Sequence, residues 1–433
     1  MNNKFQRLID LVKAVNHYEN HSSEILHLTA NENIMSSLAR GFLSSRLSYR
    51  YHLGTHNDYH LQEIVNKSGL IFKGMPAVYQ LEQEARRVSL NNFSAIDCDF
   101  RYLSGVHGLI ATVALTTKPG DVIYSISPED GGHFATQGIV TALGRKSVLM
   151  NFDQKTLNID IDNLSCLTKE ITPDVIILDH GATMFEFPLK KIRDIVGNEP
   201  LLIFDASHTF GLIYGHQFKN PLLCGWDILQ GNTHKTFPGP QKAMLFFGNK
   251  NPDLSHSVIN GISNSMVSSQ HTHHAIALYI TLLEMHFFGA KYAEQTVQNA
   301  KTLANELEKY GFNILQNKQN HTDTNIVFIK NDSKKLTEAR CRKLHSSGIS
   351  TNARRIYGAE LLRLGVQEIT RKGMSTNEIK FIARLIKHAI LDEKNCKVIQ
   401  EQIKELLNSF DNIHYSFDSI VASHNTSIFF EKM

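Results

Sequence analysis

Several features that mark secreted, membrane-bound and nucleic-acid-binding proteins are missing from this sequence. Its five cysteines are scattered without CxxC spacing, which argues against a disulfide framework or a structural zinc site and favours reduced thiols in a cytoplasmic protein. Apolar runs are strand-sized, below the roughly 20 residues that span a bilayer. Charges interrupt the first 24 residues, so we expect no signal peptide. A net charge of +3 is too small to predict a nucleic-acid partner.

What the sequence does contain is the composition of an ordinary globular protein. Apolar residues make up 42% of the chain and charged residues 20%, both typical values. A length of 433 residues exceeds what a single hydrophobic core usually serves, so we expect two domains. We divide the chain into an N-terminal arm (1–50), a large domain (51–275) and a small C-terminal domain (276–433).

Short apolar runs alternate with helical patterns through the middle of the chain, as in a parallel sheet built from βαβ units. We expect buried strands at 121–126, 175–179 and 201–205. Open α/β sheets bind ligands at the carboxyl ends of their strands, so the site is expected in the polar segments that follow. These segments are Glu129-Asp-Gly-Gly-His, His180-Gly-Ala and Ala206-Ser-His.

The pattern changes after about residue 275 and predicts a smaller α+β domain. A long helix around 279–310 should connect the two domains and end before Gly311. A strand at 326–329 and helices around 334–346 and 376–391 follow, and a further helix precedes a mixed tail.

The strongest chemical signal is a lysine between two apolar segments, in Gly231-Asn-Thr-His-Lys-Thr-Phe-Pro-Gly-Pro-Gln-Lys. A buried lysine flanked by hydroxyls and a histidine can have a lowered pKa, which makes its amine a nucleophile able to form a Schiff base. Lys235 is therefore our candidate for covalent catalysis. The segment alone also allows an ordinary polar hairpin with a solvated lysine.

A second signal, Asp205, stands at the carboxyl end of a predicted strand about thirty residues before Lys235. Pyridoxal 5'-phosphate (PLP) acts as an electron sink when a carboxylate keeps its ring nitrogen protonated, and Asp205 fits that role. A strand-end aspartate alone could equally be a helix cap.

Two weaker signals fit the same cofactor. Ser104-Gly105-Val106 precedes an apolar helical run, and a helix N-terminus offers N–H groups and a positive dipole end to a phosphate. His133 follows another strand and could stack on a flat ring. Taken alone, the first is a common helix cap and the second a structural hydrogen-bonding residue.

Together these segments resemble the serine hydroxymethyltransferase family of fold-type I PLP enzymes, across most of residues 25–375. The motifs that carry the resemblance occur in the family's order: Ala30-Asn-Glu-Asn, Ser104-Gly, Gly131-Gly-His, Asp205-Ala-Ser-His, Thr233-His-Lys-Thr and Arg363-Leu-Gly. The resemblance implies an α/β, aminotransferase-like large domain with a mostly parallel sheet and a smaller α+β C-terminal domain. It also implies a homodimer with shared active sites.

The resemblance assigns a role to each motif residue. Lys235 would carry the cofactor as a Schiff base, with Asp205 on the ring nitrogen, His133 on the ring face and His208 near the ring oxygen. Cofactor contacts would also come from Ser104, Gly105, Val106, Thr233 and, from the partner subunit, Tyr51. Arg363 would bind the substrate carboxylate through its bidentate guanidinium, with Asn31 and Glu32 beside the substrate.

One departure from the family narrows the expected function. In hydroxymethyltransferases a glutamate used for proton transfer in folate chemistry follows the tyrosine by two residues, where this chain has Leu53 and then an apparent insertion to about residue 80. In this respect the chain resembles the L-threonine transaldolase subgroup. Further segments resemble that subgroup: Leu28-Thr-Ala-Asn-Glu-Asn, Asp130-Gly-Gly-His-Phe-Ala, Leu364-Gly-Val-Gln and Tyr415-Ser-Phe-Asp.

We therefore expect a transferase that exchanges the aldehyde part of β-hydroxy-α-amino acids. The alternatives are a folate-dependent hydroxymethyltransferase acting on serine or α-methylserine, for which an acid elsewhere in 52–80 could replace the glutamate, and a noncatalytic assembly partner. The imidazoles of His271-Thr-His-His274 lack a carboxylate or cysteine at ligand spacing, so we expect no metal site.

Overall fold

The computed structural model describes residues 3–54, 56–58, 60–66, 69–392, 394–418 and 420. Within these residues a seven-stranded sheet has the order β4-β12-β11-β10-β9-β5-β6. Only β12 runs antiparallel to its neighbours, so the predicted mostly parallel sheet is confirmed. The strands are β4 (Asp97–Asp99), β5 (Val122–Ile126), β6 (Lys146–Met150), β9 (Val175–Leu178), β10 (Leu201–Asp205), β11 (Ile228–Asn232) and β12 (Ala243–Phe247).

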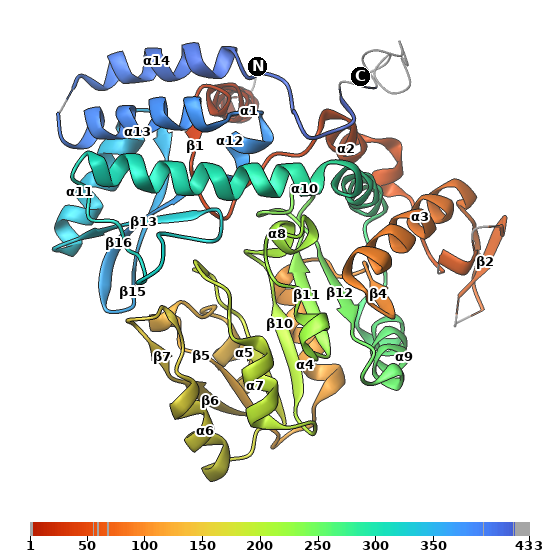
Figure 1. Cartoon of the computed structure of the whole chain (residues 1–433). Coiled ribbons are helices and arrows are strands. Elements are labelled where there is room, and N and C mark those ends of the chain that lie inside the picture. Colours follow the sequence, from red (N-terminus) through yellow and green to blue (C-terminus); the bar gives the residue numbers. More distant parts are fainter. Residues whose placement is uncertain are drawn as a thin grey trace.

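Both faces of this sheet are covered by helices, because its strands are apolar on both sides (Figure 1). One face packs against α4 (Gly105–Thr116), α5 (Thr136–Ala142) and α9 (Pro252–Gly261). The other packs against α3 (Pro76–Phe93), α6 (Ile161–Glu170), α7 (Leu189–Val196), α8 (Phe210–Tyr214) and the first half of α10 (Thr272–Lys309). In β9 and β10, alternate residues face opposite layers, so both strands are buried.

The small domain is built on an antiparallel sheet of order β13-β16-β15. Its strands are β13 (Ile326–Asn331), β15 (Asn352–Ile356) and β16 (Ala359–Gly365), and its helices are α11 (Lys334–Ser346), α12 (Gln367–Arg371), α13 (Thr376–Ile390) and α14 (Cys396–Asn408). The predicted helix at 334–346 is confirmed, and the one at 376–391 differs by one residue. Of the predicted tail, residues 419 and 421–433 lie outside the described residues.

The predicted connecting helix exists as α10 (Thr272–Lys309), which starts before residue 279. Its first turns are apolar and buried, with Ala275 and Leu278 in the core of the large domain. Its last turns place Leu303 and Leu307 in the core of the small domain. This one helix therefore ties the two cores together, as Figure 1 shows.

The N-terminal segment reaches the small domain before the chain enters the large one. After α1 (Asn3–Ser22), β1 (Leu26–His27) pairs in parallel with β14 (Ile349–Ser350). Leu26 and Leu28 are part of the small-domain core. The short helices α2 (Ser37–Gly41), η1 (Phe42–Ser44) and η2 (Arg46–Tyr49) then lead to the large domain. The proposed boundaries near residues 50 and 275 stay predictions.

The apparent insertion after residue 52 forms a projecting β-hairpin, at the right of Figure 1. It comprises η3 (His56–Asp58), β2 (Glu63–Val65) and β3 (Ile71–Lys73), and the chain then enters α3. The remaining short elements are η4 (Pro128–Asp130), β7 (Phe152–Asp153), β8 (Asn158–Ile159), η5 (Pro221–Cys224) and the π-helical turn η6 (Ile262–Met266).

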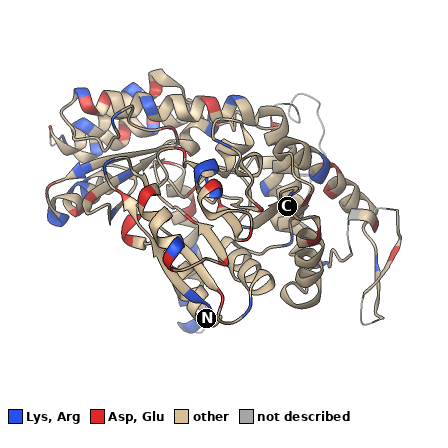
Figure 2. Ribbon diagram, turned by 60° about the horizontal axis from the view of Figure 1, so that its bottom comes forward, with Lys and Arg blue, Asp and Glu red and all other residues tan. Residues whose placement is uncertain are grey.

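Two general properties of the chain complete this description. No helix within the described residues is both long and apolar enough to cross a membrane. Lys and Arg are interspersed with Asp and Glu over the ribbon, so the two charge signs share the same elements (Figure 2).

Candidate active site

Lys235 lies in the tight connection between the antiparallel strands β11 and β12, as the sequence predicted. The connection is held by the Gly239 N–H, which donates to the Thr233 carbonyl (2.7 Å), and the Lys242 N–H, which donates to the Thr233 hydroxyl (2.9 Å). That hydroxyl in turn donates to the Pro240 carbonyl. Thr233 thus shapes the lysine loop, and its predicted contact with the cofactor stays a prediction.

The Lys235 amine faces a small cavity and is only 9% exposed. Its Nζ lies 3.0 Å from His208 Nε2. Burial lowers the pKa of Lys235 to about 8, with Arg363 lowering it further and Asp205 opposing the shift. Burial and the charge of Lys235 also hold the pKa of His208 well below its usual range, so that its neutral ring can accept a hydrogen bond from the amine. A reactive free amine is therefore available near neutral pH.

This environment predicts a pH dependence for cofactor attachment. A protonated ammonium is not a nucleophile, so the second-order rate of covalent PLP attachment to the cofactor-free protein should rise about tenfold per pH unit below pH 8 and level off above it. An unperturbed lysine would level off only near its ordinary pKa of about 10.4. The rate can be followed by stopped-flow absorbance. A rate that still rises tenfold per unit above pH 9 would contradict the lowered pKa.

Asp205 ends β10 and faces the same cavity. Its carboxylate accepts hydrogen bonds from the Ser207 N–H (2.8 Å), the Ser207 hydroxyl and the Gln230 side-chain amide (3.1 Å). These three donors fix the orientation of the carboxylate. The structure therefore places an oriented carboxylate at the end of the predicted strand, and its role on the ring nitrogen stays a prediction.

A second carboxyl group, Asp179, lines the cavity and had no predicted role. It follows β9, whose Leu178 is the register partner of Phe204 in β10, so Asp179 and Asp205 lie level on neighbouring strands. Asp179 is 3% exposed, and burial together with Asp205 raises its pKa to about 8. Asp179 ends the strand predicted at 175–179, and a polar residue at a strand end is the signal that could have identified it as a site residue.

His133 also lines the cavity, in the turn after η4. Its backbone N–H donates to the Asp179 carbonyl (3.1 Å) and is 3.3 Å from the Asp179 carboxyl group. The preceding turn requires Gly131, whose φ of 93° and contact with the His180 ring leave no room for a side chain. Burial lowers the pKa of His133, with Lys235 and Arg354 adding to the shift and Asp205 opposing it, so the ring is neutral near pH 7.

The predicted phosphate cradle is the N-terminus of α4. The Ser104 side chain accepts from the His107 N–H (3.2 Å) and caps the helix, and Gly105 and Val106 line the cavity. A Cβ on Gly105 would lie 1.9 Å from the Asn232 side-chain oxygen, so a larger residue there would displace the Asn232 side chain. Free N–H groups and the positive end of the helix dipole suit a phosphate at this position.

Arg363 reaches the site from β16 in the small domain and is 7% exposed. Its guanidinium donates to Asn352 Oδ1 (2.8 Å), Asn31 Oδ1 (2.9 Å) and the Gly181 carbonyl (3.3 Å). The Gly181 contact places Arg363 at the edge of the Lys235 cavity, because Gly181 lines it. Burial lowers the pKa of Arg363 to about 10, with Arg354 adding to the shift and Glu32 opposing it.

The N-terminal segment contributes the remaining predicted residues. Asn31 is bonded to Arg363, and the charge of Glu32 acts on the same guanidinium. Asn33, which was not predicted, donates to the Lys235 carbonyl (2.6 Å). The predicted substrate residues are therefore brought together, although their roles stay predictions.

Tyr51, a predicted cofactor contact, lies apart from the Lys235 cavity. Its ring is 56% exposed and packs edge-on against Phe72, with 5.9 Å between ring centroids. It does not line the Lys235 cavity of its own chain. Its predicted role was to reach the cofactor of a partner subunit, and that role stays a prediction.

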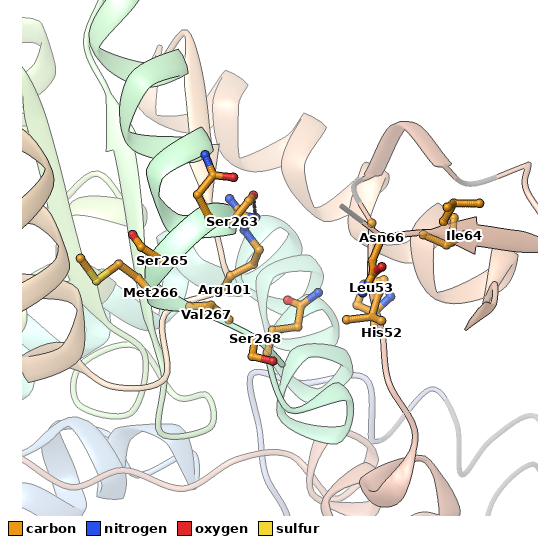
Figure 3. Close-up of a pocket in the computed structure, with 14 residues that line it drawn as sticks. His52, Leu53, Ile64, Asn66, Arg101, Ser263, Ser265, Met266, Val267 and Ser268 are labelled. Carbon is orange, nitrogen blue, oxygen red and sulfur yellow. Dashed lines mark hydrogen bonds between the residues drawn. The ribbon is translucent and has the colours of Figure 1, made fainter. Parts of the chain in front are cut away.

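Leu53 lies in a second, larger cavity of about 720 Å³ (Figure 3). Its walls come from the segment His52–Gly54, the hairpin residues Ile64–Asn66, Arg101 and the stretch from Ser263 onward. The wall segment is anchored to α3, where His52 Nε2 lies 2.9 Å from Glu82 Oε2 and the Tyr79 hydroxyl donates to the Leu53 carbonyl. Among the described residues, no aspartate or glutamate lines this cavity.

The residues around Lys235 fit PLP. A partly neutral buried amine suits the cofactor's aldehyde, a hydrogen-bonded carboxylate suits its ring nitrogen, and a helix N-terminus that begins with Gly105 suits its phosphate. His208 Nδ1 is buried without a hydrogen-bond partner among the described residues, and so is available to a ligand. This fold and this set of groups define a fold-type I PLP enzyme.

The comparisons with known proteins give the family. A model of the serine hydroxymethyltransferase family matches residues 6–386, and the chain belongs to this family. It is accordingly a PLP-dependent transferase, as the sequence predicted.

The relatives of this chain include transaldolases and serine hydroxymethyltransferases. The chain is 34% identical over 406 residues to a fluorothreonine transaldolase from Streptantibioticus cattleyicolor; the match covers 94% of this chain and 63% of that protein. It is 31% identical over 416 residues to a serine hydroxymethyltransferase from Methanosphaera stadtmanae, covering 93% and 94% of the two chains. The crystal structure of L-threonine transaldolase from Pseudomonas fluorescens in its internal aldimine state superposes with a TM-score of 0.87, at 29% identity and 97% coverage of both chains.

Proposed function

We propose that this enzyme is an L-threonine transaldolase. In the proposed reaction the Cα–Cβ bond of threonine breaks, the β-hydroxyl loses its proton and acetaldehyde leaves. Cα then forms a new bond to the carbonyl carbon of a second aldehyde, and the oxygen of that aldehyde takes up a proton. The products are acetaldehyde and a new β-hydroxy-α-amino acid. Likeness to a fluorothreonine transaldolase and an L-threonine transaldolase supports this assignment.

The observation that carries the proposal is Leu53, which stands where the resemblance places the folate enzymes' proton-transfer glutamate. A leucine side chain cannot exchange a proton. Since no described acidic residue lines the cavity around Leu53, that proton-transfer role has no obvious substitute there. Cleavage of threonine does not need this group, because it requires only a base for the β-hydroxyl.

Each group in the site has a separate role in the proposed reaction. PLP, when bound, supplies an electron sink that stabilises negative charge at Cα. Arg363 binds and orients the substrate carboxylate, which sets the direction of the Cα–Cβ bond. Asp205, oriented by its three hydrogen bonds, would hold the ring nitrogen of the cofactor.

His133 is our candidate for the base that takes the β-hydroxyl proton. Its backbone is fixed by Asp179, and its lowered pKa keeps the ring neutral and able to accept a proton. The same protonated ring can return the proton to the oxygen of the second aldehyde. One histidine could therefore serve both halves of the exchange.

The test is product analysis with matched donors and acceptors. Mixing the holoenzyme with L-threonine should release acetaldehyde, and adding benzaldehyde or an aliphatic aldehyde should increase the release while a new β-hydroxy amino acid accumulates. Tetrahydrofolate should have no effect, because the folate-linked proton transfer lacks its acid. Rapid folate-dependent conversion of L-serine to glycine, with threonine left intact, would overturn the proposal.

The alternative is a hydroxymethyltransferase in which a nearby acid replaces the missing glutamate. Asp58 is the relevant candidate, because its carboxylate lies against Gly54, 2.7 Å from where a Cβ would stand. It does not line the cavity around Leu53. If the enzyme converts L-serine to glycine with tetrahydrofolate, an Asp58→Asn variant that keeps this activity would leave this acid without a catalytic role.

We also propose a cytoplasmic homodimer with shared active sites. Two exposed apolar features of the chain support an interface. One side of α1 exposes Phe5, Leu8, Leu11, Val12, Val15 and Tyr18. The hairpin exposes Val65 and Ile71 next to Tyr51 and Phe72. An interface over the hairpin would bring Tyr51 to a neighbouring subunit.

A further inference from the structure

Strand β15 turns an arginine toward the active site. Side chains alternate along a strand, so Asn352 and Arg354 project from the same face, whereas Arg355 projects from the other. Asn352 accepts a hydrogen bond from Arg363, which fixes this face as the one toward the substrate side of the site. Arg355 on the opposite face is exposed and forms an ion pair with Glu360 (3.1 Å).

The end of β15 is held against the loops that form the site. The Tyr357 N–H donates to the Glu129 carbonyl (2.9 Å), and the Tyr357 hydroxyl lies 2.8 Å from His180 Nε2. The charge of Arg354 lowers the pKa values of His133 and His208 in the cavity, and also that of Arg363. These effects agree with the contacts of β15, which place Arg354 between Asn352, bonded to Arg363, and Tyr357, bonded to the cavity residue His180.

Arg354 nevertheless has no hydrogen bond or ion pair with any residue that the structure describes. It is partly buried, and burial lowers its pKa. The Arg363 guanidinium, by comparison, donates three hydrogen bonds, to Asn31, Asn352 and the Gly181 carbonyl. A guanidinium that loses water without gaining a partner is unfavourable, and an anionic ligand would remove that cost.

We propose that Arg354 binds an anionic group, a carboxylate or a phosphate, on the acceptor aldehyde. This inference rests on the proposed transaldolase function and names its second substrate class. The α-carboxylate of the amino acid is assigned to Arg363, so Arg354 is free for a second negative group. The product would be a β-hydroxy-α-amino acid with an additional anionic group on its side chain.

The cofactor's own phosphate is a poor candidate for this arginine. The phosphate cradle at Ser104–Val106 lies against Asn232 of β11. Arg354 instead lies by the loops that follow β5 and β9, where Glu129 and His180 contact Tyr357. In the sheet, β10 separates β11 from β9. The two positively charged positions are therefore on different sides of the cavity.

The test compares two acceptors that differ in charge. With L-threonine as donor, the wild-type enzyme should use 4-formylbenzoate with a kcat/KM at least about tenfold higher than methyl 4-formylbenzoate, as expected for a charge-assisted hydrogen bond. Arg354→Gln should bring this ratio close to one, and Arg354→Lys should retain part of it. Arg355→Gln, which changes the neighbouring exposed arginine, is the matched control and should keep the wild-type ratio.

A binding measurement separates this inference from the proposed function. Calorimetry with the nonreactive 4-(hydroxymethyl)benzoate and with benzyl alcohol, both in the presence of glycine, should show tighter binding of the anion to the wild type and no preference in Arg354→Gln. If no aldehyde is incorporated but this preference is found, the transaldolase proposal fails and the anion site stands. Equal binding of the two alcohols to the wild type would overturn the anion site. So would an Arg354→Gln variant that raises the KM for L-threonine and leaves the acceptor ratio unchanged.

Discussion

Lys235→Ala is expected to abolish covalent attachment of PLP and to reduce turnover by at least about 10⁴-fold, the scale seen when a nucleophile is removed from an enzyme. Lys235 is the amine on the cavity that also contains Asp205, His133 and His208. Its lowered pKa makes it partly neutral near pH 8, which an exposed lysine is not. Borohydride reduction followed by peptide mass analysis measures the covalent bond directly.

Lys242 provides the control because it is another buried lysine near the same loop. Burial lowers its pKa to about 7, so its amine is also partly neutral, but its Nζ donates to the Gln270 carbonyl (3.0 Å) and does not line the cavity. Lys242→Met should therefore keep the reducible adduct. A Lys235→Ala protein that retains the adduct, together with a Lys242→Met protein that loses it, would show the assignment to be wrong.

Arg363→Ala should weaken binding of L-threonine by about 2–5 kcal/mol, or on the order of 30-fold to several thousand-fold, because a desolvated charge-assisted pair is lost. PLP affinity should change much less, since the guanidinium contacts Asn31, Asn352 and Gly181 and not the phosphate cradle. Threonine affinity can be measured from the change in cofactor absorbance during titration.

Arg363→Lys is the informative companion variant. A lysine keeps the charge but cannot present two parallel N–H groups to a carboxylate, so it should restore only part of the affinity. Both variants should retain their cofactor absorbance, which checks that the cofactor site remains folded. Unchanged threonine affinity in Arg363→Ala would remove this residue from the substrate site.

The sequence predicted those parts of the site that depend on local signals. Lys235 lies between two apolar segments, and Asp205 ends an apolar run, so a strand end could be assigned to each without knowledge of the fold. Ser104 could be assigned because a small-residue turn before an apolar run marks a helix start. The start of α10 was missed because the histidines at 271–274 interrupt the apolar pattern of its first turn.

Other parts of the site depend on the register between strands and on the packing of the small domain against the large one. Local sequence patterns encode neither. The position of Asp179 beside Asp205 follows from the pairing of Leu178 with Phe204 between β9 and β10. The orientation of Arg354 follows from the register of β15 with β16 and from the contact of Tyr357 with the large domain. Neither relation can be read from the spacing of residues along the chain.

The N-terminal segment, which pairs with β14 through β1 and then contacts Arg363 through Asn31, also affects how the enzyme folds. Asn31 and Arg363 bond to each other across 332 positions of sequence, so the chain must close a very long loop before this contact exists. Contacts of such separation form late and slow folding. During synthesis the N-terminal segment must wait until β14 and β16 have left the ribosome. The carboxylate-binding half of the site is therefore completed after most of the large domain has been made.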